Sequence, residues 1–394
     1  MAYSTLHVAA TARGLGDGST YNNAAEAFPG GNWLSQALVN DYSAAGLVLL
    51  FQNTAPYTLS QAGSTAIFSS TVPGVNTYGL TCLSADSNGN VVSPSDLGWK
   101  CSQGNLDTTG FAAITYSLTS AMVAATKIAF RCFDITSPSQ TGSLFATPYG
   151  IIDWCNISCT TNGTGTALIA VSLASNSAGI TNSQVNQSGG YARMVSGTSA
   201  GLILNVRVIG DPASTTGTRY GIAYSTNSPV PPVNGPVFVK DCPGVGIINF
   251  NTGSNAGWQL SRATVVDCGT GIATLNGTSG GNGLLLVTDS VITGCTYGLS
   301  QPYGRYDLRN VVLRNSTDFQ YAAGTPVFDP LSIVTAETDS QLYTDHASGD
   351  YRIKTTSAHW GKNRGAQDAP ATGGGITQAR LNHVKNMMRH GVSI

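Results

Sequence analysis

Short apolar segments separated by turns fill most of the chain. From about residue 60, segments of four to six residues alternate with turns rich in Gly, Asn, Asp, Ser and Pro. Segments of this length, bounded by turn residues, are typical of β-strands. The pattern therefore predicts an all-β fold made of many short strands.

Four of these segments share one pattern of inward and turn positions. An inward aliphatic residue is followed by two turn-prone residues, an inward Cys or Asn, a turn and a second inward aliphatic residue. The Cys or Asn positions are Cys242, Cys268, Cys295 and Asn315, which follow one another after 26, 27 and 20 residues. A repeat of this irregular length fits a coil of three short strands and is shorter than a propeller blade.

Such coils predict a ladder inside the molecule. After each coil the chain returns to the same place about 4.8 Å further along the axis, so the four Cys and Asn residues are expected to stack in the interior. Residues 61–365 are therefore predicted to form a single-stranded right-handed parallel β-helix, a solenoid in which differences in coil length fall in the turns.

The two ends of the chain are expected to differ from the coils. In residues 1–60, Asn32 is placed to cap a short helix, and residues 47–51 are predicted to be a buried strand. The helix would cover the open end of the stack, as a solenoid requires. Residues 366–375 contain three consecutive glycines and are predicted to be a flexible linker.

The last segment, residues 376–394, is predicted to form a basic amphipathic helix. It contains three Lys or Arg residues, and no acidic residue follows Asp368. The leading hypothesis is that this helix docks on an acidic protein surface or joins copies of the chain. The alternatives are that it folds back over the last coil or is a disordered tail. The docking candidates are Arg380, Leu381, Val384, Lys385, Met388 and Arg389.

The composition limits the classes of function. Only 10% of the residues are charged and the formal net charge is −1, so direct binding of nucleic acid by a basic face is not expected. No apolar run of 18 residues is present, and the first residues lack the pattern of a secretory signal, so neither a membrane span nor export is predicted. The eight cysteines form no CxxC pair, and we expect reduced thiols packed as small apolar residues.

Several segments resemble a known superfamily. The opening GDGSTYNNAAEAF, the later NWLSQAL and APYTL, and the closing SGDYRIKTTSAHWGKNRGA are similar to the first and last coils of right-handed parallel β-helix proteins of the pectate-lyase-like superfamily. The resemblance covers most of residues 13–365 and implies the same fold. It says little about function, because that superfamily includes lyases, hydrolases, adhesins and viral structural proteins.

The residues that enzymes of this superfamily use are scarce. Glycoside hydrolysis needs two carboxylates on one face, but Glu occurs only twice in the chain. Asp241 and Asp267 occupy equivalent coil positions, where we prefer a turn role to a carboxylate pair or a calcium site. Of the motifs of a polygalacturonase-like site, only Arg352-Ile353-Lys354 is present, and it is assigned to the final coil. We therefore predict no catalytic residue, metal or cofactor.

These observations favour a structural protein of a bacteriophage virion. The leading hypothesis is a non-enzymatic capsid decoration (cement) protein or a head fibre, assembled in the host cytoplasm and released by lysis. A stacked β-core supplies the slow unfolding that such proteins need. The resemblance implies a homotrimer, with the major capsid protein or other virion proteins as partners.

Two alternatives remain open from the sequence. One is a tail fibre or tailspike that binds or depolymerises host surface polysaccharide. The other is a bacterial adhesin, which the lack of a secretory signal disfavours. A polysaccharide would need aromatic stacking surfaces, for which the candidates are Tyr220, Tyr224, Tyr297, Tyr303 and Tyr306.

Overall fold

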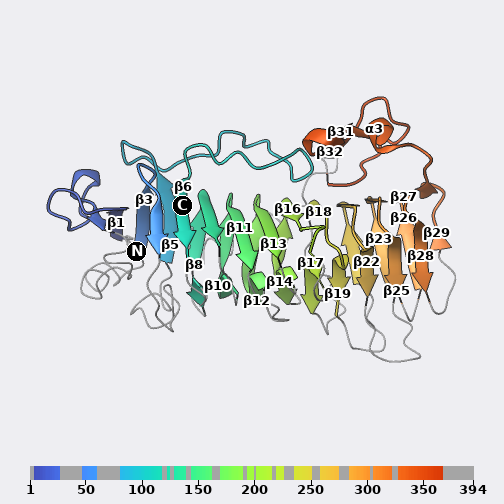
Figure 1. Ribbon diagram of the computed structural model, residues 1–394, viewed down its shortest axis with the longest axis horizontal. Coiled ribbons are helices and arrows are strands. Elements are labelled where there is room, and N and C mark those ends of the chain that lie inside the picture. The colour runs from blue at the N-terminus through green and yellow to red at the C-terminus, as the bar shows by residue number, and fades with distance from the viewer. Residues whose placement is uncertain are drawn as a thin grey trace.

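Parallel β-sheets dominate the computed structural model (Figure 1). It describes residues 4–26, 47–59, 80–117, 122–124, 128–138, 143–161, 169–189, 193–198, 201–214, 219–225, 235–250, 258–274, 284–301, 305–321 and 327–366. In these residues, three parallel sheets and one antiparallel hairpin contain nearly all the regular structure. The expected all-β class with parallel strands is confirmed, and the arrangement is compatible with a β-helix.

Strands pair within each sheet in the following order. Sheet A contains β2 (Ala25–Glu26), β1 (Ser4–Ala9), β3 (Leu47–Gln52), β5 (Leu80–Ala85), β8 (Ile128–Arg131), β10 (Phe145–Asp153), β12 (Ile169–Thr181), β14 (Arg193–Thr198), β17 (Tyr220–Ser225), β19 (Val245–Asn249), β22 (Thr270–Thr274), β25 (Tyr297–Gln301) and β28 (Thr317–Tyr321), with β7 (Val123–Ala124) beside β10 and β15 (Leu202–Leu204) beside β12. Sheet B contains β4 (Tyr57–Leu59), β6 (Ala112–Tyr116), β9 (Phe133–Ser137), β11 (Asn156–Thr161), β13 (Gln184–Gly189), β16 (Val206–Ile209), β18 (Val237–Lys240), β21 (Ala263–Val266), β24 (Val291–Thr293), β27 (Val312–Arg314) and β30 (Ile333–Val334). Sheet C contains β20 (Trp258–Ser261), β23 (Leu284–Thr288), β26 (Arg305–Arg309) and β29 (Val327–Phe328).

The later part of the chain visits the three sheets in a repeating order. Strands β20, β21 and β22 lie in sheets C, B and A, and the next two sets of three strands repeat this order. We call one such passage a circuit. The turns are bonded between circuits as well, since Gly269 N donates to Cys242 O at 3.0 Å and Thr296 N donates to Cys268 O at 3.1 Å. Equivalent residues of successive circuits therefore lie next to one another.

Aliphatic columns fill the space between the sheets. The register of sheet B places Val239, Val265, Ile292 and Leu313 side by side, each at most 1% exposed. A matching column in sheet A contains Ile222, Ile247, Ile272 and Leu299. The register repeats because side chains alternate between the two faces of a strand, so an inward residue must pair with an inward residue of the next strand.

The earlier strands of sheets A and B fill the same interior with aromatic rings. Phe51 and Phe133 lie edge to face with centroids 5.3 Å apart, and Phe130 contacts both Phe133 and Phe145 at 5.4 Å. All four rings are at most 1% exposed. Rings can replace the aliphatic columns because edge-to-face pairs pack at these distances. Their irregular spacing explains why the sequence repeat is weak in this part of the chain.

The boundary predicted at residue 60 stays a prediction, and strands on both sides of it belong to the same sheet. β1 pairs with β3, and β3 pairs with β5, so residues on both sides of the boundary share sheet A. Alternating apolar residues such as Leu6 and Val8 bury one face of β1 in the common core. The strand predicted at residues 47–51 is confirmed as β3. The capping helix predicted after Asn32 lies outside the described residues.

The C-terminal part of the described chain also differs from the expectation of a last coil. Residues 339–353 form a short helix, α3 (Asp339–Leu342), and an antiparallel hairpin of β31 (Tyr343–Asp345) and β32 (Asp350–Ile353). The hairpin leaves the stack because Tyr343 and Tyr351 pack on the outer side of sheet B, where the Tyr351 ring lies 5.1 Å from the Phe238 ring. Most of the predicted linker and the whole C-terminal helix lie outside the described residues.

Candidate functional site

Two segments cover the outer face of sheet B, and Figure 1 shows them running along one side of the stack. The first covering segment is residues 86–111, between β5 and β6, and the second is residues 335–366. They meet each other, because Tyr351 N donates to Ser102 O at 2.7 Å and Ser102 Oγ donates to Ala366 O at 3.1 Å. The outer face therefore carries side chains and backbone brought from distant parts of the chain.

Asn205 holds the first covering segment on the sheet. Its Oδ1 accepts from Cys101 N at 2.8 Å, and its Nδ2 donates to Trp99 O at 2.9 Å. The residue has a φ of 55°, a left-handed conformation that Asn tolerates better than most residues. One turn residue thus bends the chain into β16 and satisfies two backbone groups of a segment about 100 positions away in sequence.

Arg207 lies where both covering segments and the sheet converge. Its guanidinium donates to Cys101 O at 2.9 Å and to Gly349 O at 3.2 Å, and it lies 4.3 Å from the centroid of the Phe238 ring. Only 3% of the residue is exposed, and no carboxylate in the described chain forms an ion pair with it. Burial lowers the pKa of Arg207 to about 10, so it remains a cation at neutral pH.

An open groove lies between the covering segments beside Arg207. Its volume is about 340 Å³. Polar side chains dominate its lining, among them Asn105, Gln184, Asn186, Arg207, Lys240 and Tyr351. The lining also contains Asp241, which pairs with Lys240, so the groove offers both hydrogen-bond donors and acceptors and is suited to a hydroxyl-rich group and not to an apolar one.

A row of hydrogen-bonded side chains leads from the groove along the outer face of sheet B. Gln184 Nε2 donates to Asn186 Oδ1 at 3.1 Å, and Asn186 Nδ2 donates to Asn156 Oδ1 at 3.1 Å. Asn156 Nδ2 then donates to Asp134 Oδ1 at 2.8 Å. Each amide donates to the next residue of the row, so the row has a defined direction and its side chains are oriented in advance.

Lys240 forms ion pairs with the two equivalent carboxylates, Asp241 and Asp267, at one corner of the stack. Its Nζ lies 2.7 Å from Asp241 Oδ2 and 3.9 Å from Asp267 Oδ2. Burial disfavours the charged Lys240, but its hydrogen bond to Asp241 and the neighbouring negative groups outweigh this effect and raise its pKa. Asp241 and Asp267 have φ values of 58° and 53°, so both adopt the left-handed turn conformation. The predicted turn role fits this geometry, and no metal-binding cluster of His, Cys, Asp and Glu occurs in the described residues.

The structure places the three predicted ladder cysteines in the interior, with Asn315 half-buried at the next position. Cys242, Cys268 and Cys295 are each at most 3% exposed, and each thiol donates to the carbonyl two residues before it. Asn315 takes the next position, with its Oδ1 accepting from Cys295 N at 3.1 Å. Burial raises the pKa of Cys268 well above that of a free thiol, and the Cys268 thiol together with burial does the same for Cys295. Cys268 and Cys295 are therefore packing groups and not nucleophiles.

Glycines face this thiol ladder from sheet A. A Cβ on Gly246 would lie 3.2 Å from Cys268 Sγ and 2.8 Å from the carbonyl oxygen of Gly271. A Cβ on Gly271 would meet Gly298 O at 2.6 Å. Each ladder position therefore needs a small side chain such as that of Cys, and the facing position in the preceding strand of sheet A must be Gly.

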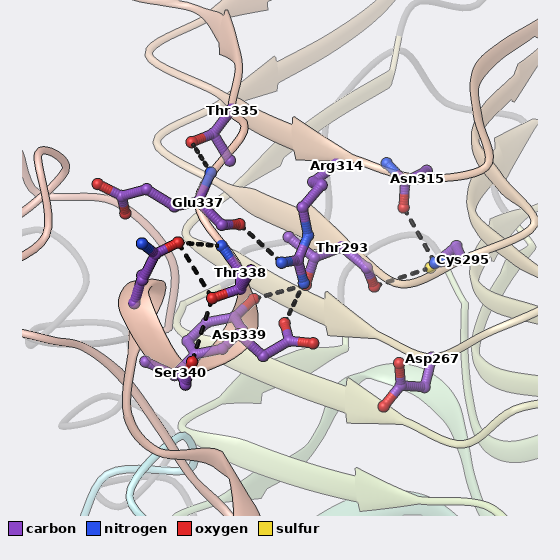
Figure 2. Close-up of polar contacts among 12 residues, drawn as sticks. Asp267, Thr293, Cys295, Arg314, Asn315, Thr335, Glu337, Thr338, Asp339 and Ser340 are labelled. Atoms are coloured by element: carbon purple, nitrogen blue, oxygen red, sulfur yellow. Dashed lines mark hydrogen bonds and ion pairs between the residues drawn. The ribbon is translucent and has the colours of Figure 1, made fainter.

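Arg314 anchors the second covering segment beyond the ladder, as Figure 2 shows. It reaches from β27 to the carbonyl oxygen of Glu337 at 2.6 Å and to the carboxylate of Asp339, the first residue of α3. Thr338 N donates to Gln341 Oε1 at 2.8 Å and so helps to cap this short helix. Tyr343, which follows α3, has its hydroxyl 2.7 Å from Thr293 Oγ1 in β24.

Other residues predicted to be candidates for function have structural positions or lie outside the described residues. Tyr224 and Tyr306 are each 1% exposed in the core, and Tyr220 and Tyr297 are half-buried. Arg352 and Ile353 belong to the outer hairpin and not to a final coil. Outside the described residues lie Tyr303, Arg380, Leu381, Val384, Lys385, Met388 and Arg389.

Comparison with protein-family models, curated proteins and solved structures found no match to this chain. In the part of the chain that the structure describes, no helix has the length and apolar character needed to span a membrane. The function must therefore be inferred from the residues and contacts of this chain.

Proposed function

We propose that the three parallel sheets close into a single-stranded right-handed β-helix and that the chain is a non-enzymatic structural protein of a bacteriophage virion. The repeating passage through sheets C, B and A supports the first part, because each circuit returns in the same direction to a parallel neighbour. Parallel crossovers are right-handed in nearly all proteins. A capsid decoration protein or head fibre that assembles as a trimer on other virion proteins is the form we favour.

The observation that carries this proposal is the continuous buried core. One connected cluster of buried residues extends from Leu6 in β1 to Leu313 in β27. The two covering segments add long-range contacts outside it, such as Arg207 to Gly349. Opening such a stack requires many non-local contacts to break together, which favours slow unfolding. Burial raises the pKa of the Cys82, Cys155 and Cys268 thiols well above that of a free thiol, which makes these three thiols poor nucleophiles.

Immunogold electron microscopy tests the virion location. An antibody against the purified chain is applied to phage particles released from cells in which the chain is naturally produced. We expect gold on the capsid surface and the chain in the particles by mass spectrometry. Particles that lack the chain would overturn the proposal, and gold confined to the tail tip would favour the second candidate function.

The second candidate is a tail protein that binds host surface polysaccharide, and the groove beside Arg207 favours it. The row from Gln184 to Asp134 presents oriented amide groups next to the groove, as sugar hydroxyls require. Retardation of the chain in gels containing host polysaccharide measures the binding, and Asn186→Ala is expected to weaken it. Release of shorter saccharides from the polysaccharide would contradict the non-enzymatic assignment.

A further inference from the structure

One inner column of sheet A changes from apolar to polar along the stack. The register places Leu173, Gly197, Tyr224, Asn249 and Thr274 side by side in successive strands. Asn249 and Thr274 lie two positions after the inner aliphatic residues of β19 and β22, so both side chains point into the same interior. They are 1% and 4% exposed. Buried polar side chains need hydrogen-bond partners, so each of these two side chains requires one.

Three buried polar atoms at this place lack a hydrogen-bond partner in the part of the chain that the structure describes. They are Asn249 Oδ1, Thr274 Oγ1 and Trp258 Nε1. Trp258 begins β20 in sheet C, and its ring packs on the same column, with its centroid 5.7 Å from that of Tyr224. An unsatisfied buried polar group destabilises the folded state. Three such groups where sheets A and C meet therefore indicate a bound molecule.

The spacing of the strands suits a small bridging molecule. In-register residues of neighbouring strands lie about 4.8 Å apart, and two hydrogen bonds of about 2.8 Å that share one central atom span this distance. On the outer face of sheet B, the in-register hydroxyls of Ser188 and Thr160 bond directly at 3.1 Å. Asn249 Oδ1 and Thr274 Oγ1 form no such direct bond in the described chain. A molecule with a single heavy atom therefore fits between them.

The three groups require a molecule that both donates and accepts hydrogen bonds. The amide oxygen of Asn249 only accepts, the indole N–H of Trp258 only donates, and the Thr274 hydroxyl can do either. A cation would leave the indole N–H without a partner, and an anion would leave the amide oxygen without one. Water is the smallest molecule that satisfies both, and a buried water typically makes about three hydrogen bonds.

We propose that an ordered water molecule is bound inside the stack between Asn249 and Thr274. It donates one hydrogen to Asn249 Oδ1 and the other to Thr274 Oγ1, and it accepts the indole N–H of Trp258. The water thus joins two successive strands of sheet A to sheet C, whereas aliphatic contacts alone join the circuits in the neighbouring column. Such a water is a structural part of the fold.

A high-resolution crystal structure of the full chain tests the site directly. We expect a density peak at hydrogen-bonding distance, about 2.7–3.2 Å, from Asn249 Oδ1, Thr274 Oγ1 and Trp258 Nε1. A direct bond between Asn249 and Thr274, an atom of the chain at the position of the peak, or no peak would overturn the proposal. Crystals soaked in rubidium chloride test for a cation, and an anomalous signal at the peak would also overturn it.

A matched pair of variants tests the site in solution. Asn249→Leu with Thr274→Val removes both oxygen partners at nearly constant shape, whereas Thr270→Val makes the same hydroxyl deletion at the half-buried start of β22. Magnetic relaxation dispersion of water nuclei counts long-lived internal waters. We expect the count to fall by one in the double variant and to stay at the wild-type value in Thr270→Val. An unchanged count in the double variant, or an equal loss in both, would overturn the proposal. Neither experiment depends on where the protein sits in a virion.

Discussion

The two faces of sheet B are built in different ways. On the inner face, the contacts Val239–Val265 and Val265–Ile292 join residues 26 and 27 positions apart, and the pattern repeats from circuit to circuit. On the outer face, Asn205 bonds to a residue 104 positions away and Arg207 to one 142 positions away. The interior therefore depends on a repeated local pattern, whereas the outer face depends on two segments that return from elsewhere in the chain.

The largest effect is expected from a side chain added to the inner column. In Gly271→Val, the new Cβ would lie 2.5 Å from Ile292 Cγ2 and 2.6 Å from Gly298 O, and the backbone oxygen cannot move without breaking the sheet. Overpacking of this kind should lower the free energy of unfolding by about 3 kcal/mol. The midpoint and slope of urea unfolding measure the change.

Gly197→Ala in β14 is the control for this prediction. The nearest atoms to its added Cβ would be those of the Tyr224 ring, at 3.6 and 3.7 Å, which is ordinary contact. The free energy of unfolding should change by less than about 1 kcal/mol. Equal destabilisation by both substitutions would show that the close approach of neighbouring circuits does not limit the inner column.

The second prediction concerns the outer face. Asn205→Ala removes the bonds to Cys101 N and Trp99 O and leaves Ala at a φ of 55°. The free energy of opening of residues 86–111 should fall by about 2 kcal/mol, because two buried backbone groups lose their partner. Hydrogen exchange should show faster exchange at residues 99–106 and no change in the columns of β21 and β24.

Asn205→Gly separates the two causes in this prediction. Glycine adopts the positive φ without strain but makes no side-chain hydrogen bond. If the hydrogen bonds matter, the covering segment should open in Asn205→Gly nearly as much as in Asn205→Ala. Exchange at the wild-type rate in Asn205→Gly would attribute the effect to backbone strain.

The interior could be predicted from the sequence because its determinants recur at short intervals. The spacing of Cys242, Cys268 and Cys295 is itself the spacing of the circuits. In the earlier strands of sheets A and B, rings such as Phe130 and Phe133 replace the aliphatic columns and have no regular spacing, so the sequence repeat is weak there. The sequence of β32 has the alternating pattern of any short strand, so it did not show that β32 forms a hairpin and not a last coil.

The candidate site could not be predicted in the same way. Arg207 lies in the apolar run Val-Arg-Val-Ile, and one signal was a charged residue inside this apolar run. Its partners are backbone carbonyls of Cys101 and Gly349, which carry no residue-specific signature. The turn-rich stretch 86–111 with its single Trp was another signal. Neither of these two signals shows which part of sheet B the first covering segment lies on.

A third, smaller effect should follow from acidification of the outer face. Arg364 donates to His359 Nδ1 at 2.6 Å, so the proton of the neutral ring is on Nε2, which lies 3.0 Å from Thr335 Oγ1. Burial and the charge of Arg364 lower the pKa of His359 below 6.5, although Glu337 acts in the opposite direction. The folded state therefore binds a proton less readily than the unfolded chain.

The stability that neutral His359 contributes is present above pH 6.5 and is lost as the pH falls below that value toward the lowered pKa. Exchange in residues 335–366 should accelerate over this range, while the inner columns keep their rates. His359→Gln should remove this pH dependence at residues 335–366. If hydrogen exchange in β21 and β24 accelerated equally, the stability of the outer face would not be independent of that of the inner columns.

The smallest effect is expected where the outer face of sheet B has no cover. Thr160 in β11 is exposed, and its Oγ1 accepts from Ser188 Oγ at 3.1 Å. Thr160→Ala should change the free energy of unfolding by less than about 0.5 kcal/mol, because water replaces the lost hydrogen bond. Urea unfolding, compared with Asn205→Ala on the same face, measures the difference. Thr160 points outward from β11 and Asn205 is the turn residue that leads into β16 of the same sheet. A small effect at Thr160 would show that contact with the covering segments, and not position on the outer side alone, makes a residue sensitive. A loss comparable to that of Asn205→Ala would mean that the sheet itself is the sensitive element.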